Sequence, residues 1–193
     1  MNSLRLTWLN AVAASPIFST RVRARLLRLG GVDVRGAGVF PHVRFVSGHD
    51  VTLHRHSFVN VGVLFDARAH VDLGRSVAVG PGVQFLTSSH PLGPAWHRAG
   101  GGEIEIAPIV VEEGCWIGAG AIILGGVTIG RGCVIGANAV VLRDCQPNGL
   151  YVGVPARRKS DLPDGLPTSD DLGAFSIQAL GGRISPVSPV LPG

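Results

Sequence analysis

The sequence lacks long apolar runs and has few cysteines. No apolar run approaches the roughly 18 residues of a membrane-spanning helix, which argues against an integral membrane protein. The three cysteines, Cys115, Cys133 and Cys145, include no C-x-x-C pair, and their odd number favours neither a disulfide framework nor a zinc knuckle. We therefore expect a reducing compartment, the cytoplasm, and no bound metal.

Acidic residues are nearly absent from the first 35 positions, where six arginines face a single acidic residue, Asp33. The chain has a formal net charge of +4, so the remaining residues are close to neutral. A nucleic-acid-binding surface carries its positive charge on the folded body. We therefore expect no nucleic-acid partner.

Glycine, in contrast, is abundant, with 28 residues in a chain of 193. Glycine is costly inside helices and strands because it loses the most conformational freedom on folding. This composition excludes a helical bundle and favours many short strands separated by turns.

Aliphatic residues recur every six positions in the second half of the chain. The first position of each hexad is aliphatic, and the position four residues later is small or of medium size. The aliphatic positions are Val111, Ile117, Ile123, Ile129, Ile135 and Val141. The smaller residues that follow them are Cys115, Ala121, Val127, Cys133, Ala139 and Cys145.

The first half has the same period with a slip of two residues. Leu53, Val59 and Phe65 are in phase, and the series resumes at Leu73 and continues to Phe85. A period of six does not fit an amphipathic helix. It predicts three short strands per coil of a triangular prism, with the aliphatic residues and the cysteines pointing inward. The segment near 90–108 has no hexads and reads as a loop extruded from this all-β domain.

These hexads, often with glycine after the aliphatic residue, resemble those of the hexapeptide-repeat acyltransferases. The resemblance implies a left-handed parallel β-helix, with acetyl-CoA as acyl donor and a homotrimer with active sites between subunits. We expect the β-helix domain to span residues 36–160. It would follow a basic helical segment at 1–35 and precede a Pro-rich, disordered tail at 161–193.

The N-terminal segment is expected to be helical over 3–29, broken near Pro16 and ended by Gly30-Gly31. Its second half places Val22, Leu26 and Leu29 on one stripe, next to a stripe of arginines. One interpretation is that the apolar stripe caps the open first coil. The alternative is a weak contact of residues 1–29 with an anionic membrane surface.

The loop opens with T-S-S-H-P-L at 87–92, and this stretch resembles the active-site segment of the maltose, galactoside and nodulation-type sugar O-acetyltransferases. Two later runs, 116–130 and G-V-P-A-R at 153–157, match the same group. A thioester is already activated, so a hydroxyl nucleophile mainly needs its proton removed as it attacks. A histidine that titrates near neutrality suits this task, which makes His90 the predicted general base.

The resemblance also implies the remaining site residues. Asn60 would contact the acceptor, and Asp66 lies near an acidic acceptor-binding position, although the slip at 66–72 takes it out of register. The alternative for Asn60 is a structural role as a cap at a corner of the prism. The positions implied for the coenzyme are Trp116, Ala119, Ala137, Arg143 and Arg157.

Four functions follow from these observations. The leading one is acetyl transfer from acetyl-CoA to a hydroxyl of a sugar or glycosylated acceptor. The others are N-acetylation of an amino sugar, a non-catalytic β-helix module and a zinc carbonic anhydrase. The carbonic anhydrase would need further histidines such as His49 and His54, which precede His90 instead of following it.

Overall fold

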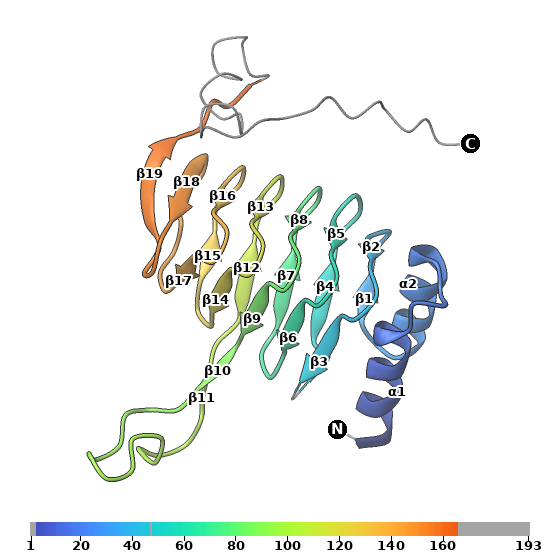
Figure 1. Cartoon of the computed structure of the whole chain (residues 1–193), viewed down its shortest axis with the longest axis horizontal. Helices are drawn as coiled ribbons and strands as arrows, with labels where there is room; N and C mark the ends of the chain where they lie inside the picture. Colours follow the sequence, from blue (N-terminus) through green and yellow to red (C-terminus); the bar gives the residue numbers. More distant parts are fainter. Residues whose placement is uncertain (1–2, 47, 166–193) are drawn as a thin grey trace. The chain divides into compact units, whose positions relative to one another are not determined.

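The computed structural model describes residues 3–46 and 48–165, and their main body is a left-handed parallel β-helix (Figure 1). The fold predicted from the hexads is confirmed. Each coil contributes one short strand to each of three sheets, here called A, B and C. The corners at which the chain passes between sheets are called the A–B, B–C and C–A corners.

Sheets A and C contain parallel strands only. Those of sheet A are β1 (Asp33–Val34), β4 (Val51–Leu53), β7 (Val71–Leu73), β12 (Ile109–Val111) and β15 (Thr128–Ile129). Those of sheet C are β3 (Arg44–Val46), β6 (Leu64–Asp66), β9 (Gln84–Leu86), β14 (Ile122–Leu124) and β17 (Val140–Val141).

Sheet B ends in an antiparallel strand that the repeat did not predict. Its strands are β2 (Gly38–Val39), β5 (Phe58–Val59), β8 (Ala78–Val79), β13 (Trp116–Ile117), β16 (Val134–Ile135), β18 (Gly149–Val152) and β19 (Arg157–Asp161). Arg158 fastens this end, because its guanidinium donates to the carbonyls of Gln146 and Pro147 and to the Tyr151 hydroxyl. The predicted tail lies outside the described residues from 166 onward.

The core consists of the inward rows that the period predicts. Phe45, Phe65 and Phe85 stack in successive coils, with ring centroids 5.5 and 5.1 Å apart. The cysteines are buried corner residues, as expected, and burial raises the pKa of the Cys115 and Cys145 thiols to about 12. Such thiols are not reactive nucleophiles at neutral pH.

The sequence slip corresponds to a change in coil length. Leu64 pairs with Gln84, so this coil has 20 residues, whereas Val110 pairs with Thr128 and that coil has 18. The two additional residues lie at the C–A corner. The long loop leaves from the same corner, between β9 and β12, and its base is a two-stranded ribbon of β10 (Ser88–Ser89) and β11 (Glu105–Ile106) (Figure 1).

Two helices cover the first coil, as predicted: α1 (Ser3–Ala14) and α2 (Thr20–Leu29). The covering face predicted for α2 is confirmed at Leu26, which packs against the core, but is wrong at Val22 and Leu29. α2 buries Arg23, Ala24 and Leu27, while Val22 and Leu29 are exposed and Leu26 is half-buried. An arginine occupies the buried face of α2 because backbone carbonyls of the first coil and of the link between the helices need a donor there.

Arg23 is a buried connector between the cap and the first coil. Its guanidinium donates to the carbonyl of Val39 in β2 and to the carbonyls of Ser15 and Phe18 in the link between the helices. Burial lowers the pKa of this guanidinium. Three carbonyl acceptors therefore depend on one side chain.

Replacing Arg23 by Met should destabilise the cap, because it leaves buried acceptors without a donor. Each such loss costs roughly 1–3 kcal/mol, so we expect the free energy of unfolding to fall by at least about 2 kcal/mol. Urea unfolding followed by circular dichroism measures this change. Arg21→Met, at an exposed position of the same helix, is the control, and equal stability of the two variants would contradict the role given to Arg23.

Candidate active site

A pocket on the outer face of sheet C brings two of the predicted site residues together. Its volume is about 420 Å³, and its lining includes Asp66 at the end of β6 and His90 just after β10. Arg68, Ser88 and Ile104 also contribute to its wall. The pocket exists because the loop leaves the prism at the C–A corner and passes over the outward side chains of sheet C.

Asp66 is a charged group in an unusual position for this fold. It is only 8% exposed, and one of its carboxylate oxygens, Oδ2, accepts a hydrogen bond from the Ser88 hydroxyl. The other oxygen, Oδ1, is buried and has no hydrogen-bond partner among the described residues. A buried carboxylate oxygen without a donor is costly, and Asp66 carries this cost beside a pocket that it lines as a residue, which makes it a candidate ligand-binding group.

Thr87 holds the base of the loop against the preceding coil, and the sequence analysis gave it no role. Its buried hydroxyl donates to the backbone carbonyl of Asp66 and accepts from the amides of Arg68 (3.1 Å) and Ala69 (3.2 Å). The residues at the slip are therefore tied to the start of the loop. The slip in the six-residue period could have predicted that Arg68 lines the pocket, because the two additional residues of this coil lie at the corner that forms the pocket wall.

A second, smaller cavity of about 300 Å³ lies on the other side of the ribbon. Its lining includes Leu86 and Ser89 from one coil and Leu124 and Gly125 from the next. The ribbon of β10 and β11 thus lies between two hollows on sheet C. Two ligands could therefore bind on either side of the ribbon, close to the base of the loop.

The residues expected at the coenzyme lie elsewhere on the prism. Ala119 and Ala137 are exposed at the B–C corner, one coil apart, and the amide of Asn138 donates to the carbonyl of Ala119. Trp116 is exposed on the outer face of sheet B, in register with Ala78 and Val134. A side chain at Gly118 would approach the amide of Ala137 within 2.6 Å, so glycine is needed here for the two coils to pack this closely.

Asn60 and the two predicted arginines, Arg143 and Arg157, lie outside the pocket that holds His90. Asn60 follows β5 at the B–C corner, and its side chain accepts from the amide of Val61, so it is not part of the pocket that holds His90. Arg157 is the first residue of β19. The amide of the preceding residue, Ala156, donates to the carbonyl of Val140 at the start of β17. Arg143 is exposed after β17, at the C–A corner. One chain therefore does not assemble all the predicted groups in one place.

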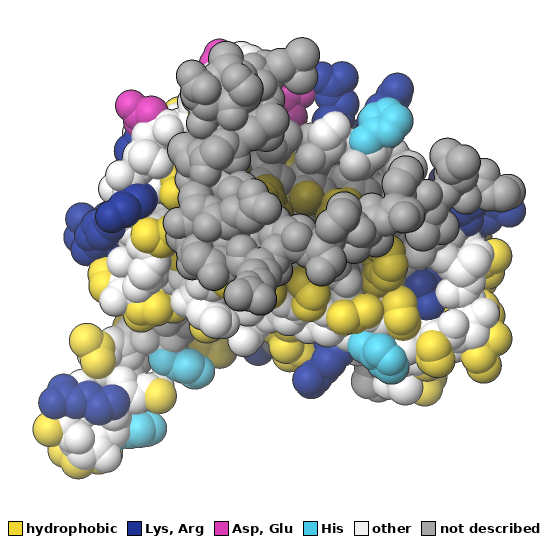
Figure 2. Space-filling view, turned by 45° about the horizontal axis from the view of Figure 1, so that its top comes forward, with side chains coloured by type: hydrophobic (Ala, Val, Ile, Leu, Met, Phe, Trp, Pro, Cys, Tyr) yellow, Lys and Arg dark blue, Asp and Glu magenta, His cyan; other side chains and the backbone are white. Residues whose placement is uncertain are grey.

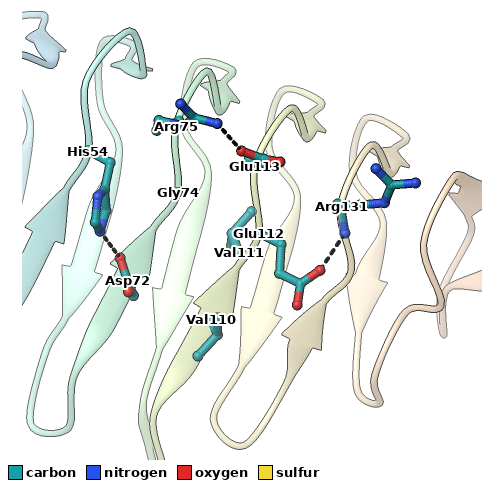
Figure 3. A pocket seen from close by; sticks show the side chains of 9 residues that line it. All are labelled: His54, Asp72, Gly74, Arg75, Val110, Val111, Glu112, Glu113 and Arg131. Carbon is teal, nitrogen blue, oxygen red and sulfur yellow. Dashed lines mark hydrogen bonds and ion pairs between the residues drawn. The ribbon is translucent and has the colours of Figure 1, made fainter. Parts of the chain in front are cut away.

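The outer face of sheet A carries a third pocket, of about 400 Å³ (Figure 3). In Figure 3, His54 and Asp72 point toward one another from neighbouring coils at 3.0 Å, and Arg75 pairs with Glu113 at 2.7 Å. None of the residues predicted for the acetyltransferase site lines this pocket. Across residues 3–46 and 48–165, no three His, Cys, Asp or Glu side chains are grouped so that they could hold a metal ion.

Triangular left-handed β-helices with one long loop form a recognisable class of protein, and comparisons place the chain within it. The family profile described as bacterial transferase hexapeptide (six repeats) matches residues 108–143. A hexapeptide-repeat acetyltransferase of Vibrio cholerae, solved with acetyl-coenzyme A, is 30% identical with a TM-score of 0.74, over 83% of this chain and 87% of that one. The chain belongs to the hexapeptide-repeat acyltransferase family.

Two further relatives are named for sugar-related or nodulation functions. A maltose O-acetyltransferase of Clostridium difficile is 26% identical with a TM-score of 0.70, over 83% of this chain and 86% of that one. Nodulation protein L of Rhizobium meliloti is 37% identical over 123 residues, which are 63% of this chain and 66% of that protein. The chain spans about half to two thirds of the length of the curated relatives it matches.

Removing the Thr87 hydroxyl should loosen the base of the loop. In Thr87→Val the amides of Arg68 and Ala69 lose their acceptor, at a cost of about 1 kcal/mol or more. We expect these two amides to exchange with deuterium roughly tenfold faster than in the unaltered protein. Thr87→Ser keeps the hydroxyl and is the matched control. Unchanged protection in Thr87→Val would show that other contacts hold the loop.

Proposed function

We propose that this protein transfers an acetyl group from acetyl-CoA to a hydroxyl of a sugar or glycosylated acceptor. The observation that carries the proposal is the pocket on sheet C, which both His90 and the largely buried Asp66 line. The relatives named as a maltose O-acetyltransferase and an acetyl-CoA-bound acetyltransferase support the reaction class.

In this mechanism the Asp66 carboxylate accepts a hydrogen bond from one hydroxyl of the acceptor and so orients it. His90 then removes the proton of a second hydroxyl as its oxygen attacks the thioester carbon. The carbon–oxygen bond forms, the carbon–sulfur bond breaks, and the proton on the imidazole passes to the departing thiolate. Free coenzyme A and an acetyl ester are the products, so no metal ion is needed for proton balance.

The acetyl donor is assigned to the B–C corner. Ala119 and Ala137 leave room for an extended pantetheine chain along the wall, and Trp116 would flank it. Arg157, an exposed guanidinium in β19 of sheet B, would pair with the phosphates of the nucleotide, because the planar guanidinium fork matches a phosphate. Arg143, at the C–A corner, would reach a phosphate only of a donor held by another copy of the chain. Asn60, on the same corner, would contact the acceptor.

A homotrimer would bring these groups together, since the donor wall and His90 lie at opposite edges of sheet C. Two exposed features favour an assembly through copies of this chain. The loop presents Leu92 and Trp96, which are 83% and 85% exposed, and the outer face of sheet B presents Phe58 and Trp116. Cyclic packing would cover such apolar side chains. Cytoplasmic localisation is part of the same proposal, because buried free thiols suit a reducing compartment.

N-acetylation of an amino sugar is the competing reaction, since His90 can deprotonate an amine as well. The orphaned Asp66 oxygen gives no preference between the two acceptors, because both O–H and N–H can donate to it. Treating the product with alkaline hydroxylamine separates them, because an ester is cleaved and an amide survives.

The His90→Ala variant should lose most of its turnover. General acid–base catalysis contributes about 10²–10⁴-fold, and we expect kcat to fall within that range. The assay follows release of the coenzyme A thiol with maltose, galactosides and glucosamine offered as acceptors. His56→Asn is the control, because His56 is an exposed residue with a positive φ of 64° that asparagine also tolerates. A folded His90→Ala protein with near-normal kcat would remove His90 from the mechanism.

A further inference from the structure

The two N-terminal helices have an outward face that the β-helix does not use. α2 turns Arg23, Ala24 and Leu27 toward the first coil. At about 100° per residue, Val22 and Leu29 lie on the far side of the helix, whereas Leu26 lies at the edge and packs against the core. The exposed residues Val22 and Leu29 are therefore not explained by capping, although the cap is formed.

This face is strongly apolar for a surface. Ile17 and Leu29 are 87% and 79% exposed, and Leu4 of α1 is 78% exposed. Trp8, one helical turn after Leu4, lies beside the end of α2, because a side chain at Gly30 would come within 2.8 Å of its ring. Trp8 and Leu29 thus lie together near Gly30, while Ile17 lies in the link before α2. Single exposed leucines are ordinary, but a group of this kind marks an interaction surface.

Unpaired positive charge flanks the apolar stripe. Arg21, Arg25 and Arg28 lie on the adjacent stripe of α2, all exposed, and none of their side chains has a hydrogen bond or ion pair within the described part of the chain. Residues 3–32 contain no acidic side chain, and the first one, Asp33, is paired with Arg35 at 2.6 Å. Figure 2 shows hydrophobic and basic side chains gathered at the end of the molecule where Figure 1 places the helices.

We propose that the α1–α2 face binds the surface of an anionic lipid membrane. A second protein would be expected to pair these arginines individually, whereas a headgroup layer supplies diffuse negative charge next to an apolar interior. The apolar side chains would enter the boundary between headgroups and acyl chains, and the arginines would stay among the phosphates. The contact is peripheral, since α1 has 12 residues and α2 has 10, and no helix in the described ranges is long and apolar enough to cross a membrane.

The test uses the full chain and vesicles of phosphatidylglycerol mixed equally with phosphatidylcholine, with pure phosphatidylcholine vesicles as the neutral probe. We expect sedimentation with the anionic vesicles only, and release as the salt concentration rises. The triple variant Arg21→Gln, Arg25→Gln, Arg28→Gln should bind on the order of 100-fold more weakly. The double variant Ile17→Ser, Leu29→Ser should also lose at least about tenfold in affinity.

A charge-matched triple variant, Arg55→Gln, Arg98→Gln, Lys159→Gln, removes three exposed positive charges elsewhere and should bind as the unaltered protein does. Circular dichroism and thermal unfolding verify that all variants are folded. Equal binding by the two triple variants would overturn the proposal, as would equal sedimentation with neutral vesicles. If the double variant instead lowers the molar mass of the protein in solution, the face is a contact between copies and the membrane assignment is wrong.

Discussion

Parallel hydrogen bonding between successive coils constrains nearly every other feature of this molecule. Each strand pairs in register with the strand one coil before it, so each inward side chain lies over another inward side chain. Because side chains alternate between the two faces of a strand, one extra residue within a strand would turn the core row outward. Additional residues can therefore enter only at a corner, where the chain turns between sheets.

This protein places its additions at one corner. The two-residue extensions before β4 and β7 and the long loop before β12 all follow strands of sheet C. Stacking brings the extension after Asp66 directly against the start of the loop, where the Thr87 hydroxyl joins them. The pocket around Asp66 and His90 is thus a consequence of irregularities that occur at the same corner in consecutive coils.

Much of the fold could be predicted from the sequence because a six-residue period has few structural solutions. Inward rows such as Ile117, Ile123 and Ile129 follow directly from the spacing. The site was predicted less completely, because hexads do not say which outward residues of different coils meet. The partnership of Asp66 with Ser88 depends on a coil offset of 20 rather than 18 residues, and Thr87 makes its bonds through a hydroxyl that no pattern distinguishes. The face of α2 that covers the first coil was mispredicted because the apolar pattern does not show that Arg23 is buried. Its guanidinium satisfies three backbone carbonyls, which a leucine cannot do.

The central claim is that the base of one chain works with the donor wall of a neighbouring chain, because His90 and Ala137 lie at opposite edges of sheet C. Mixing two inactive variants in one oligomer tests this claim most directly. His90→Ala removes the base, and Ala137→Trp fills the donor wall. Equal co-expression should restore about a quarter of the normal activity, since that share of interfaces in a randomly mixed ring joins an intact base to an intact wall. If the mixed oligomers form and remain as inactive as the separate variants, each site is contained within one chain and the account is contradicted.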